Sequence, residues 1–552
     1  MKRKISMFFI CILATSISFA QSYKKEVRPT KNVILMIPDG CSIGVVSTAR
    51  WYQIYNNLGG ENLAIDPYLC GTVKTHSSNA PIGDSAPTTS AYMTGMPQQT
   101  GNVSIYPPAD PENDLLYVDP AKAYQPLTTI LEASKIEKKK ATGLVVTAEF
   151  PHATPADCSS HHYKRSKYNQ IGSQMVYQNM DVVFGGGTSI MTDDMINHLK
   201  NTGVDYITDD YKAFMSHNGN KLWALFGKTS MPYDIDRNAN EIPSIAQMTQ
   251  KAIEKLSTNE NGFFLMVEGS QIDWAAHAND AFGMVTEYLA FDKAVQVAID
   301  FAKKNGETTV IVLPDHGNSG FTMGRRSLPV GYDKMTIDQF LKDFSKFKRT
   351  ASGMETILNE TSIENIKPVF KEYTGIELTD EEVNNLKRGK GHEVDNYMEV
   401  SKSLNLRSEI IKIMNSRTYW GFTSGGHTGE EVFLAAYHPK GDVPMGMNTN
   451  IDIFKYLYSV SGLQTPIDEM TEKIFAKHTD VFKGQGIIIN IDKKDPEFPV
   501  LVVKKGKKTL EIPAYKSIAY LNKSQFDLGS VTVYVDKNDT FYLPADLADK
   551  LN

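Results

Sequence analysis

The chain has 552 residues, of which 41% are hydrophobic and 22% charged, and its formal net charge at pH 7 is −6. This composition is typical of globular proteins, and the length allows a large core and two to four domains. The charge balance has no basic excess, so neither nucleic acid nor an anionic membrane surface is an implied partner.

The first twenty residues have the pattern of a signal peptide. Met1–Lys4 is positively charged, Met7–Ser16 is apolar, and Ser18–Ala20 forms a small-x-small cleavage site before Gln21. An uncleaved membrane anchor is the alternative interpretation. No later run reaches the length of a membrane span, so we expect an exported protein, periplasmic or secreted, without a transmembrane segment.

Removal of residues 1–20 leaves three cysteines, Cys41, Cys70 and Cys158. An odd number is not a disulfide framework, and at most one bridge could form. We expect all three to be buried free thiols. Stability must then come from packing.

Residues 31 to about 315 alternate strand-like and helix-like stretches, which is typical of a parallel α/β sheet. The predicted strands are Asn32–Pro38, Gly71–Thr75, Ala141–Thr147, Asp181–Phe184, Gly262–Val267 and Thr308–Leu313. The predicted helices are Ile43–Tyr55, Ala86–Tyr92, Leu127–Ser134, Ser244–Leu256 and Ala281–Lys304. Gly95–Tyr124 is rich in Pro, Gly and polar residues, so we expect a long loop there.

The α/β alternation stops in residues 317–420, which are rich in Lys, Glu and Asn and show helical periodicity. We expect a mainly helical insertion that serves as a lid or an oligomer contact. Its predicted helices are Ile337–Phe347, Ser362–Tyr373, Asp380–Leu386 and Tyr397–Ile413. The strand Glu431–Tyr437 and the helix Ile451–Ser461 then resume the α/β catalytic domain, which we place at residues 21–482.

Residues 483–552 have a different sequence pattern, in which short strand-like runs are separated by polar residues. We predict a small β-rich C-terminal domain without a catalytic constellation. Its predicted strands are Gly486–Ile491, Val500–Val503, Tyr515–Tyr520, Val531–Val535 and Thr540–Leu543.

Four apolar runs of the α/β region are each followed by an acidic residue: Asp39, Glu149, Glu268 and Asp315. Buried parallel strands have continuous apolar sequences, and ligands bind beyond their carboxyl ends. Acids brought together at that edge repel one another unless cations neutralise them. The sequence therefore predicts a metal site at the edge of the sheet.

Ser85 lies beside Asp84 at the start of a small-residue helix within Gly83–Gly95. A helix N-terminus gathers unpaired N–H groups and favours an anion or an alkoxide. The alternative is that Asp84 or Ser85 is merely the helix N-cap. A serine nucleophile needs a base or a metal for activation, and the remaining motifs supply metal ligands.

Three further motifs carry histidines. Asp273 and His277 are four residues apart, so on a helix they share one face and could bind zinc, or form a surface salt bridge instead. Asp315 and His316 stand at a strand tip, where the acid often caps the next turn. His427 lies in a glycine-rich turn before another strand. Mixed nitrogen and oxygen ligands suit zinc, whereas oxygen ligands suit magnesium.

His152, Thr154 and Arg165 complete the candidate set. The hydroxyl of Thr154 could join a carboxylate in a magnesium shell. Arg165 is expected near the end of a helix, where a planar guanidinium can hold two phosphate oxygens at once. A solvated surface arginine is the alternative.

Together these residues resemble the alkaline phosphatase family of metal-dependent phosphomonoesterases. The matching motifs occur in the family's order between residues 31 and about 462: Asn32–Gly40, Asp84–Ala86, Thr94–Gly95, Thr147–Pro155, Val267–His277, Asp315–His316 and Gly426–Thr428. The resemblance implies an α/β fold whose central, mostly parallel sheet is flanked by helices. It also implies hydrolysis of small-molecule phosphate monoesters at alkaline pH, with broad specificity and, by analogy, a homodimer.

The resemblance also assigns roles to residues. Ser85 is similar to the nucleophile that becomes a phosphoserine, and Arg165 to the arginine that clamps the phosphate. The first zinc would take Asp273, His277 and His427, and the second Asp39, Asp315 and His316. The magnesium would take Asp39, Thr154 and Glu268. The family's best-studied bacterial form has Asp where His152 stands and Lys where Trp274 stands, so His152 is expected to reach the magnesium through water, and the metal of that third site stays open.

Two other functions remain in view. A diesterase or sulfatase relative is one, although the sulfatase Cys-x-Pro-x-Arg signature is absent from the sequence and Arg165 favours monoesters. An exported binding protein that keeps the fold without turnover is the other. Zinc content and the relative rates on a monoester and its methyl diester separate these possibilities.

Overall fold

The computed structural model describes residues 26–391, 397–400, 402 and 404–551. The predicted signal peptide, residues 1–20, lies outside these ranges. Within them, none of the helices combines the length and the apolar character needed to cross a bilayer.

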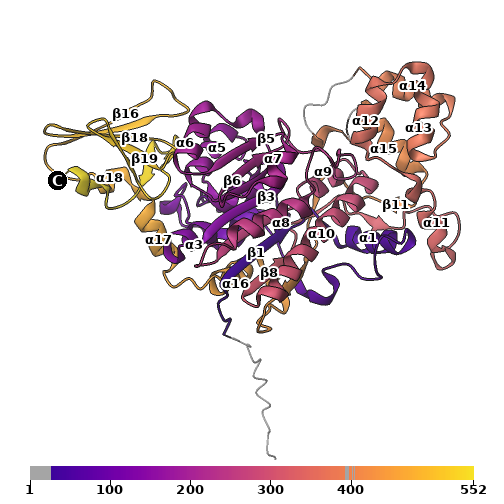
Figure 1. The fold of residues 1–552 in the computed structure, drawn as a ribbon, viewed down its shortest axis with the longest axis horizontal. Helices are drawn as coiled ribbons and strands as arrows, with labels where there is room; N and C mark the ends of the chain where they lie inside the picture. The colour runs from indigo at the N-terminus through magenta and orange to yellow at the C-terminus, as the bar shows by residue number, and fades with distance from the viewer. Residues whose placement is uncertain (1–25, 392–396, 401, 403, 552) are drawn as a thin grey trace, which may run out of the picture.

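A ten-stranded sheet forms the centre of the molecule (Figure 1), with the strand order β14-β2-β13-β8-β1-β7-β3-β4-β6-β5. Its strands are β1 (Asn32–Ile37), β2 (Leu69–Lys74), β3 (Ala141–Glu149), β4 (Val182–Gly186), β5 (Asp205–Thr208), β6 (Leu222–Leu225), β7 (Phe263–Glu268), β8 (Thr308–Val312), β13 (Val432–Tyr437) and β14 (Gly446–Thr449). Neighbouring strands run parallel except at β13, which is antiparallel to both β2 and β8. The predicted mostly parallel α/β sheet is confirmed.

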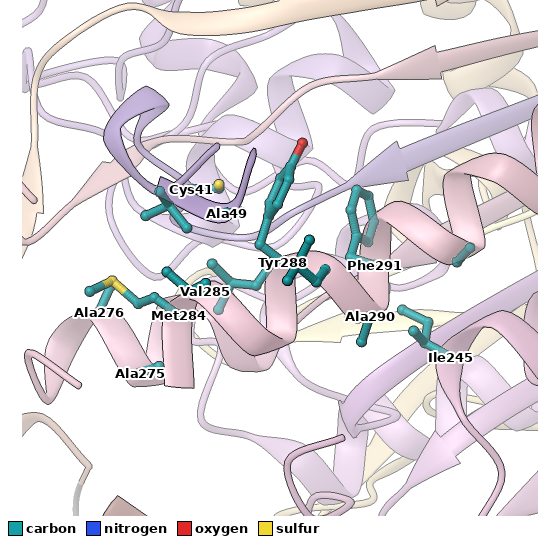
Figure 2. Close-up of a cluster of buried hydrophobic side chains, with 14 of the residues drawn as sticks. Cys41, Ala49, Ile245, Ala275, Ala276, Met284, Val285, Tyr288, Ala290 and Phe291 are labelled. Atoms are coloured by element: carbon teal, nitrogen blue, oxygen red, sulfur yellow. The ribbon is translucent and has the colours of Figure 1, made fainter. Parts of the chain in front are cut away.

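Helices cover both faces of this sheet because its central strands are buried on both sides. Side chains alternate along β1: Ile34 and Met36 join one apolar cluster, and Val33 and Leu35 join the other. Residues of α1 (Ile43–Tyr55), α8 (Ile245–Leu256), α9 (Gln271–His277) and α10 (Ala281–Asn305) pack in the first cluster, part of which appears in Figure 2. The second cluster contains residues of α2 (Ser85–Thr94), α3 (Ile130–Lys138), α4 (Ala153–Ser159), α5 (Tyr168–Tyr177), α6 (Asp193–Asn201) and α16 (Asn450–Val460).

The three cysteines are free thiols, as expected. Cys41 and Cys158 are fully buried, one in each apolar cluster. Cys70 is only partly buried, because it lies in β2 near the edge of the sheet. Packing on the two faces, rather than cross-linking, therefore supplies the stability.

The segment 317–420 is mainly helical and lies beyond α9 and α1 in Figure 1. It contains β9 (Gly317–Asn318), β10 (Thr322–Met323), α11 (Ile337–Leu341), α12 (Ala351–Glu360), α13 (Ile366–Thr374), α14 (Asp380–Gly389), α15 (Leu406–Ser416) and β11 (Trp420–Gly421). Helix α12, which the sequence analysis missed, begins at an N-cap where the side chain of Thr350 accepts from the backbone of Gly353. That segment 317–420 is an insertion that serves as a lid or an oligomer contact stays a prediction.

Two small sheets follow the α/β unit. One is antiparallel and five-stranded, with β16 (Ile487–Asp492), β17 (Val500–Lys505), β18 (Lys508–Pro513), β19 (Ile518–Leu521) and β20 (Ser524–Asp527). The other joins β21 (Val533–Val535) and β22 (Thr540–Leu543) to β15 (Ala476–Lys477), which precedes the predicted boundary at residue 483. Helices α17 (Ile467–Ile474) and α18 (His478–Val481) flank β15 in the chain.

Candidate metal centre

Three neighbouring strands deliver acids to one edge of the sheet. Asp39 follows β1, Glu268 ends β7 and Asp315 follows β8, and all three side chains are fully buried. Burial, followed by the charges of Asp315 and Asp273, raises the pKa of Asp39 well above its usual range. Burial also raises the pKa of Glu268 to about 7. Such a cluster favours bound cations, which neutralise the repulsion.

The fourth strand-end acid, Glu149, does not join this cluster. It belongs to none of the groups of metal-ligating side chains found among the described residues. The register between β3 and β4 shifts between Val145 and Glu149, so the end of β3 no longer follows the regular pairing. Glu149 instead lies by Tyr168, where burial and then this carboxylate raise the pKa of the phenol.

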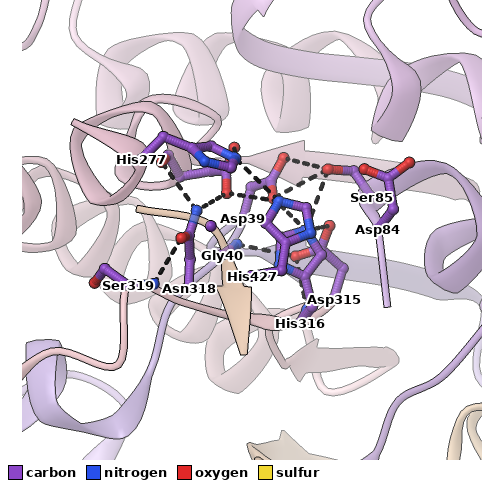
Figure 3. A network of polar contacts seen from close by, with 12 residues as sticks. Asp39, Gly40, Asp84, Ser85, His277, Asp315, His316, Asn318, Ser319 and His427 are labelled. Atoms are coloured by element: carbon purple, nitrogen blue, oxygen red, sulfur yellow. Dashed lines mark hydrogen bonds and ion pairs between the residues drawn. The ribbon is translucent and has the colours of Figure 1, made fainter. Parts of the chain in front are cut away.

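Three imidazoles converge on the same place from different elements (Figure 3). His277 ends α9, His316 follows β8, and His427 lies in β12 (His427–Thr428). The Nδ1 of each ring forms a hydrogen bond with a backbone carbonyl oxygen. The distances are 3.0 Å from His277 to Gly425, 3.1 Å from His316 to Gly317 and 2.8 Å from His427 to Gly83. A carbonyl oxygen only accepts, so each Nδ1 carries the proton and each Nε2 presents a lone pair to the site.

The ligand atoms predicted for the first zinc lie together. His277 Nε2 is 3.0 Å from His427 Nε2, and Asp273 Oδ2 and Oδ1 lie 3.5 and 3.6 Å from these two nitrogens. Asp273, His316 and His427 also have ligand atoms within 4.8 Å of one another, so His316 adjoins this group. Burial raises the pKa of Asp273, but the neighbouring imidazoles outweigh it and hold this pKa below its usual range.

The ligands predicted for the second zinc, Asp39, Asp315 and His316, also lie within 4.8 Å of one another. Ser85 Oγ lies 3.3 Å from His316 Nε2 and 3.4 Å from both Asp39 oxygens. Ser85 is the first residue of α2, and Asp84 occupies the N-cap position without a side-chain cap bond. The hydroxyl of Ser85 therefore faces the metal-ligand cluster, and Asp84 does not act as a side-chain cap.

A third group contains Asp39, His152 and Glu268, again within 4.8 Å of one another. Thr154 Oγ1 lies 3.4 Å from Asp39 Oδ2. Neither buried oxygen of Glu268 has a hydrogen-bond partner of acceptable geometry among the described residues. This donor set fits a divalent cation. The ligand nitrogen of His152 lies within 4.8 Å of the carboxylate oxygens of Asp39 and Glu268, and its predicted contact with the metal through water stays a prediction.

Arg165 lies beside the third group but not on a helix, so its expected place near a helix end was wrong. Helix α4 stops at Ser159, because Ser160 has extended backbone dihedrals. The backbone N–H of Arg165 donates to Gly101 at 2.7 Å, which anchors the loop. The guanidinium donates to Asp84 Oδ1 at 2.8 Å and lies 3.2 Å from His152 Nε2.

Two residues of the site were not singled out by the sequence analysis. Asn318 Nδ2 donates to Asp273 Oδ1 at 2.7 Å and so orients this carboxylate. Gly40 has φ of +62°, and a Cβ there would lie 2.4 Å from Asp273 Oδ1. Its backbone N–H donates to Asp315 Oδ1 at 3.0 Å. The Pro38-Asp39-Gly40 turn signal could have identified the glycine, because this sequence favours a positive φ.

A pair of aromatic side chains borders the site, one from α9 and the other from segment 317–420. The rings of Trp274 and Tyr397 are stacked, with centroids 5.3 Å apart and planes at 18°. Tyr397 also lies 5.0 Å from the ring of His277, and Trp274 lies 5.7 Å from that of His152. Tyr397 had no sequence signal, because it comes from a region distant in the chain from every recognisable motif.

Comparisons with known proteins identify the family of the chain. A family model for alkaline phosphatase matches residues 30–463. The chain belongs to the alkaline phosphatase family. Its C-terminal residues, from 464 onward, lie outside the match. As a member of this family the chain is a phosphatase, an enzyme that hydrolyses phosphate monoesters, and the predicted family and enzyme class are confirmed.

Individual relatives give the extent of the likeness. The chain is 34% identical to Alkaline phosphatase 3 of Bacillus subtilis (strain 168) over 454 residues, which cover 80% of this chain and 91% of that protein. The cold-active alkaline phosphatase of Shewanella sp. is similar in structure, with a TM-score of 0.67, 26% identity and coverage of 79% of this chain and 100% of that one. The Thermus thermophilus alkaline phosphatase shares the fold at a TM-score of 0.68 and 23% identity, with coverage of 81% and 95%.

Proposed function

We propose that the chain hydrolyses phosphate monoesters through a phosphoserine on Ser85, at a site that holds two zinc ions and one magnesium ion. The observation that carries this proposal is the position of Ser85 Oγ, 3.3 Å from His316 and 3.4 Å from Asp39, at the start of α2. Broad alcohol specificity and an alkaline pH optimum belong to the same proposal, by family resemblance.

The residues divide into three ligand sets. Asp273, His277 and His427 would hold the first zinc, and Asp39, Asp315 and His316 the second. Asp39, Thr154 and Glu268 would hold the magnesium, with His152 beside them. When bound, these cations stabilise the negative charge on the attacking and leaving oxygens of an in-line displacement.

The imidazole beside the third set is a ligand more typical of zinc than of magnesium. A variant of the alkaline phosphatase from the Antarctic bacterium TAB5, in which an aspartate replaces a histidine, binds magnesium in its M3 site. We propose magnesium here because Asp39, Thr154 and Glu268 all offer oxygen. Elemental analysis of the purified protein measures the zinc-to-magnesium ratio directly.

The protein's own groups would prepare the reaction in two ways. The N-terminus of α2 directs free backbone N–H groups toward charge that develops at Ser85. The ion pair with Asp84 restricts the position of the Arg165 guanidinium, which would bind two phosphate oxygens. Transition-state charge on the remaining phosphate oxygens would then meet a fixed donor.

The phosphoserine is tested with Ser85→Ala. We expect this variant to lose at least about 10³-fold in kcat, by analogy with removal of other nucleophiles, and to keep its metals because every ligand remains. Acid quenching with a radiolabelled monoester should trap phosphate on the wild-type chain and not on the variant. Thr89→Val is the matched control, because it removes from the same helix a buried hydroxyl that has no hydrogen-bond partner within the described part of the chain. Trapping of label on Ser85→Ala would move the nucleophile to another residue.

We further propose the organisation that the sequence implied: a signal peptide at residues 1–20, a catalytic domain at 21–482 with an insertion at 317–420, and a C-terminal β domain at 483–552. Export to the periplasm or medium and a homodimer by family analogy complete this proposal. N-terminal sequencing of the exported protein checks the cleavage site, and light scattering after size-exclusion chromatography measures the oligomeric state.

A further inference from the structure

A cavity of about 550 Å³ lies where the α/β unit meets the C-terminal strands. One wall is formed where strands of the central sheet begin, since Lys140 precedes β3, Asp181 precedes β4 and Lys221 precedes β6. The other wall includes Ser517, just before β19, and Ser530, which follows β20. The metal-ligating acids stand at the carboxyl ends of strands parallel to these, so the cavity lies at the opposite edge of the sheet.

The lining of this cavity carries more positive than negative charge. Its charged residues are four lysines and two aspartates: Lys135, Lys139, Lys140, Lys221, Asp181 and Asp527. Asp181 pairs with Lys221 at 3.1 Å and accepts from the backbone of Thr142, and Asp527 accepts from the backbone of Gly529 at 2.9 Å. The other three lysines form no ion pair with the described carboxylates. The lining therefore has an excess of two positive charges.

Two of the unpaired lysines are withdrawn from water. Lys140 is 6% exposed, and its Nζ donates to the Thr30 carbonyl at 3.2 Å. Lys135 is partly buried, and its Nζ donates to the carbonyls of Gln178 and Asn179, which also line the cavity. Burial lowers the pKa of each lysine to about 8. An ammonium group has three N–H donors, so each keeps at least one for a ligand, and an anion beside them would offset the cost of burying charge.

The wall from the C-terminal strands contributes two hydroxyl groups. Ser517 and Ser530 are 2% and 4% exposed, and neither hydroxyl has a hydrogen-bond partner among the described residues. The two loops that carry these serines are joined, because the backbone N–H of Leu528 donates to the Ser517 carbonyl at 2.8 Å. A buried hydroxyl without a partner destabilises the fold, so a ligand that only accepts hydrogen bonds would be favoured here.

We propose that this cavity is a second anion site, which binds a phosphate group between the lysines of one wall and the hydroxyls of Ser517 and Ser530. Phosphate is close to a dianion at pH 8, which matches the two excess charges, and its oxygens only accept. Inorganic phosphate is the product of phosphomonoester hydrolysis, so it is present wherever the enzyme acts. The volume leaves room for water beside the ion. The bound anion joins the C-terminal strands to the α/β unit and stabilises their junction.

This inference does not depend on the nucleophile or on the metals, because the cavity shares no residue with the candidate metal centre. The phosphate group could belong to the free ion or to a small ester. Phenylphosphonate carries the same group on a carbon that the enzyme cannot release by ester hydrolysis, so it serves as the ester probe.

Hydrogen exchange of the intact, metal-loaded protein, measured by mass spectrometry, locates the anion without hydrolysis. We expect inorganic phosphate at ten times its Kd to slow backbone exchange in residues 516–530 by up to about tenfold. Slowing by phosphate identifies the free ion as sufficient, and slowing by phenylphosphonate alone identifies an ester as the ligand. Either result supports the inference, whereas unchanged exchange in residues 516–530 with both probes would overturn it.

Substitutions in the lining connect that signal to the cavity. Lys139 is exposed, so the double variant Lys139→Gln/Ser530→Ala removes one charge and one hydroxyl without disturbing the core. We expect the phosphate concentration needed to protect residues 516–530 to rise roughly tenfold, with kcat on a monoester within about twofold of wild type. Lys200→Gln, exposed on α6 and outside the lining, is the control and should keep wild-type protection.

The same exchange data separate this inference from the proposed function. Protection around Ser85 without protection of residues 516–530 would overturn the second site and leave the proposed function intact. Protection of residues 516–530 alone would support the second site and contradict phosphate binding at the metal centre. An equal loss of protection in Lys200→Gln and in the double variant would show an effect of overall charge and would also overturn the inference.

Discussion

The Nε2 atoms of His277 and His427 lie 3.0 Å apart, although each ring donates its Nδ1 proton to a backbone carbonyl. Two nitrogen lone pairs at this distance repel each other, and Asp273 lies next to both. A cation between them converts the repulsion into coordination. These three side chains are therefore arranged to surround a positive charge, which a bound cation would supply.

Removal of divalent ions should therefore destabilise the protein as well as inactivate it. An ion that binds only the folded state contributes about 4 kcal/mol when its free concentration is 1,000 times Kd. We expect dialysis against a chelator to abolish phosphatase activity and to lower Tm by several degrees. Calorimetry before and after readdition of zinc and magnesium measures both effects. An unchanged Tm in metal-free protein would show that the imidazole cluster is stable on its own.

Gly40→Ala should damage the site through one added methyl group. The new Cβ would lie 2.4 Å from Asp273 Oδ1, at a residue whose φ is +62°. We expect zinc loss and a fall in kcat/KM of about 100-fold or more, as for a misplaced ligand. Gly203→Ala is the matched control, because φ there is +75° and no atom of the described residues lies within 4 Å of the new Cβ. That variant should lose only about 1 kcal/mol of stability from backbone strain and keep full activity.

Arg165→Lys should separate charge from geometry. Lysine keeps the positive charge but not the planar fork that can bind two oxygens. We expect kcat/KM to fall by roughly 10- to 100-fold, weaker inhibition by inorganic phosphate, and unchanged metal content. Lys167→Ala is the control, since its ion pair with Glu497 is open to solvent, with the side chains 37% and 48% exposed, and contributes little. Equal kinetics of Arg165→Lys and wild type would remove Arg165 from the phosphate site.

Lys140 should make stability depend on pH in the alkaline range. Burial lowers the pKa of Lys140 to about 8, while its Nζ donates to the Thr30 carbonyl at 3.2 Å. Between about pH 8 and 10.5, the usual lysine pKa, the unfolded state binds more protons, so this group makes stability rise with pH. Lys140→Met should therefore raise the free energy of unfolding near pH 7, and this gain should shrink toward pH 10. Urea titrations of Lys140→Met and of the exposed Lys139→Met across this range measure the difference.

The strand ends of the site were predictable because their chemistry is local. Val33–Ile37 is continuously apolar, so the acid that follows it had to emerge at the edge of a buried strand. The strands that were missed lack this signal. β6 has only four residues, and Gly446–Thr449 of β14 is exposed or half-buried at the sheet edge.

The long-range features of the site could not be predicted. Nothing in the sequence relates Tyr397 to Trp274, because their contact depends on how segment 317–420 folds back onto α9. The loop position of Arg165 depends on a backbone bond to Gly101 that no local pattern encodes. The position of His152 within 4.8 Å of Asp39 and Glu268 likewise follows from three separate elements meeting.

The pairing of β15 with β22 links Ala476 and Lys477 to residues 542 and 543. His478 adds a second tie, since its Nδ1 accepts from the backbone N–H of Phe541 at 3.1 Å. A chain still emerging from the ribosome therefore cannot close this sheet until β22 has been synthesised. The segment after α17 must wait with an unpaired strand edge, and so must β2, whose partners are β13 and β14. In contrast, β1 and β3 to β8 find partners among themselves and need no strand that follows β8 to begin pairing.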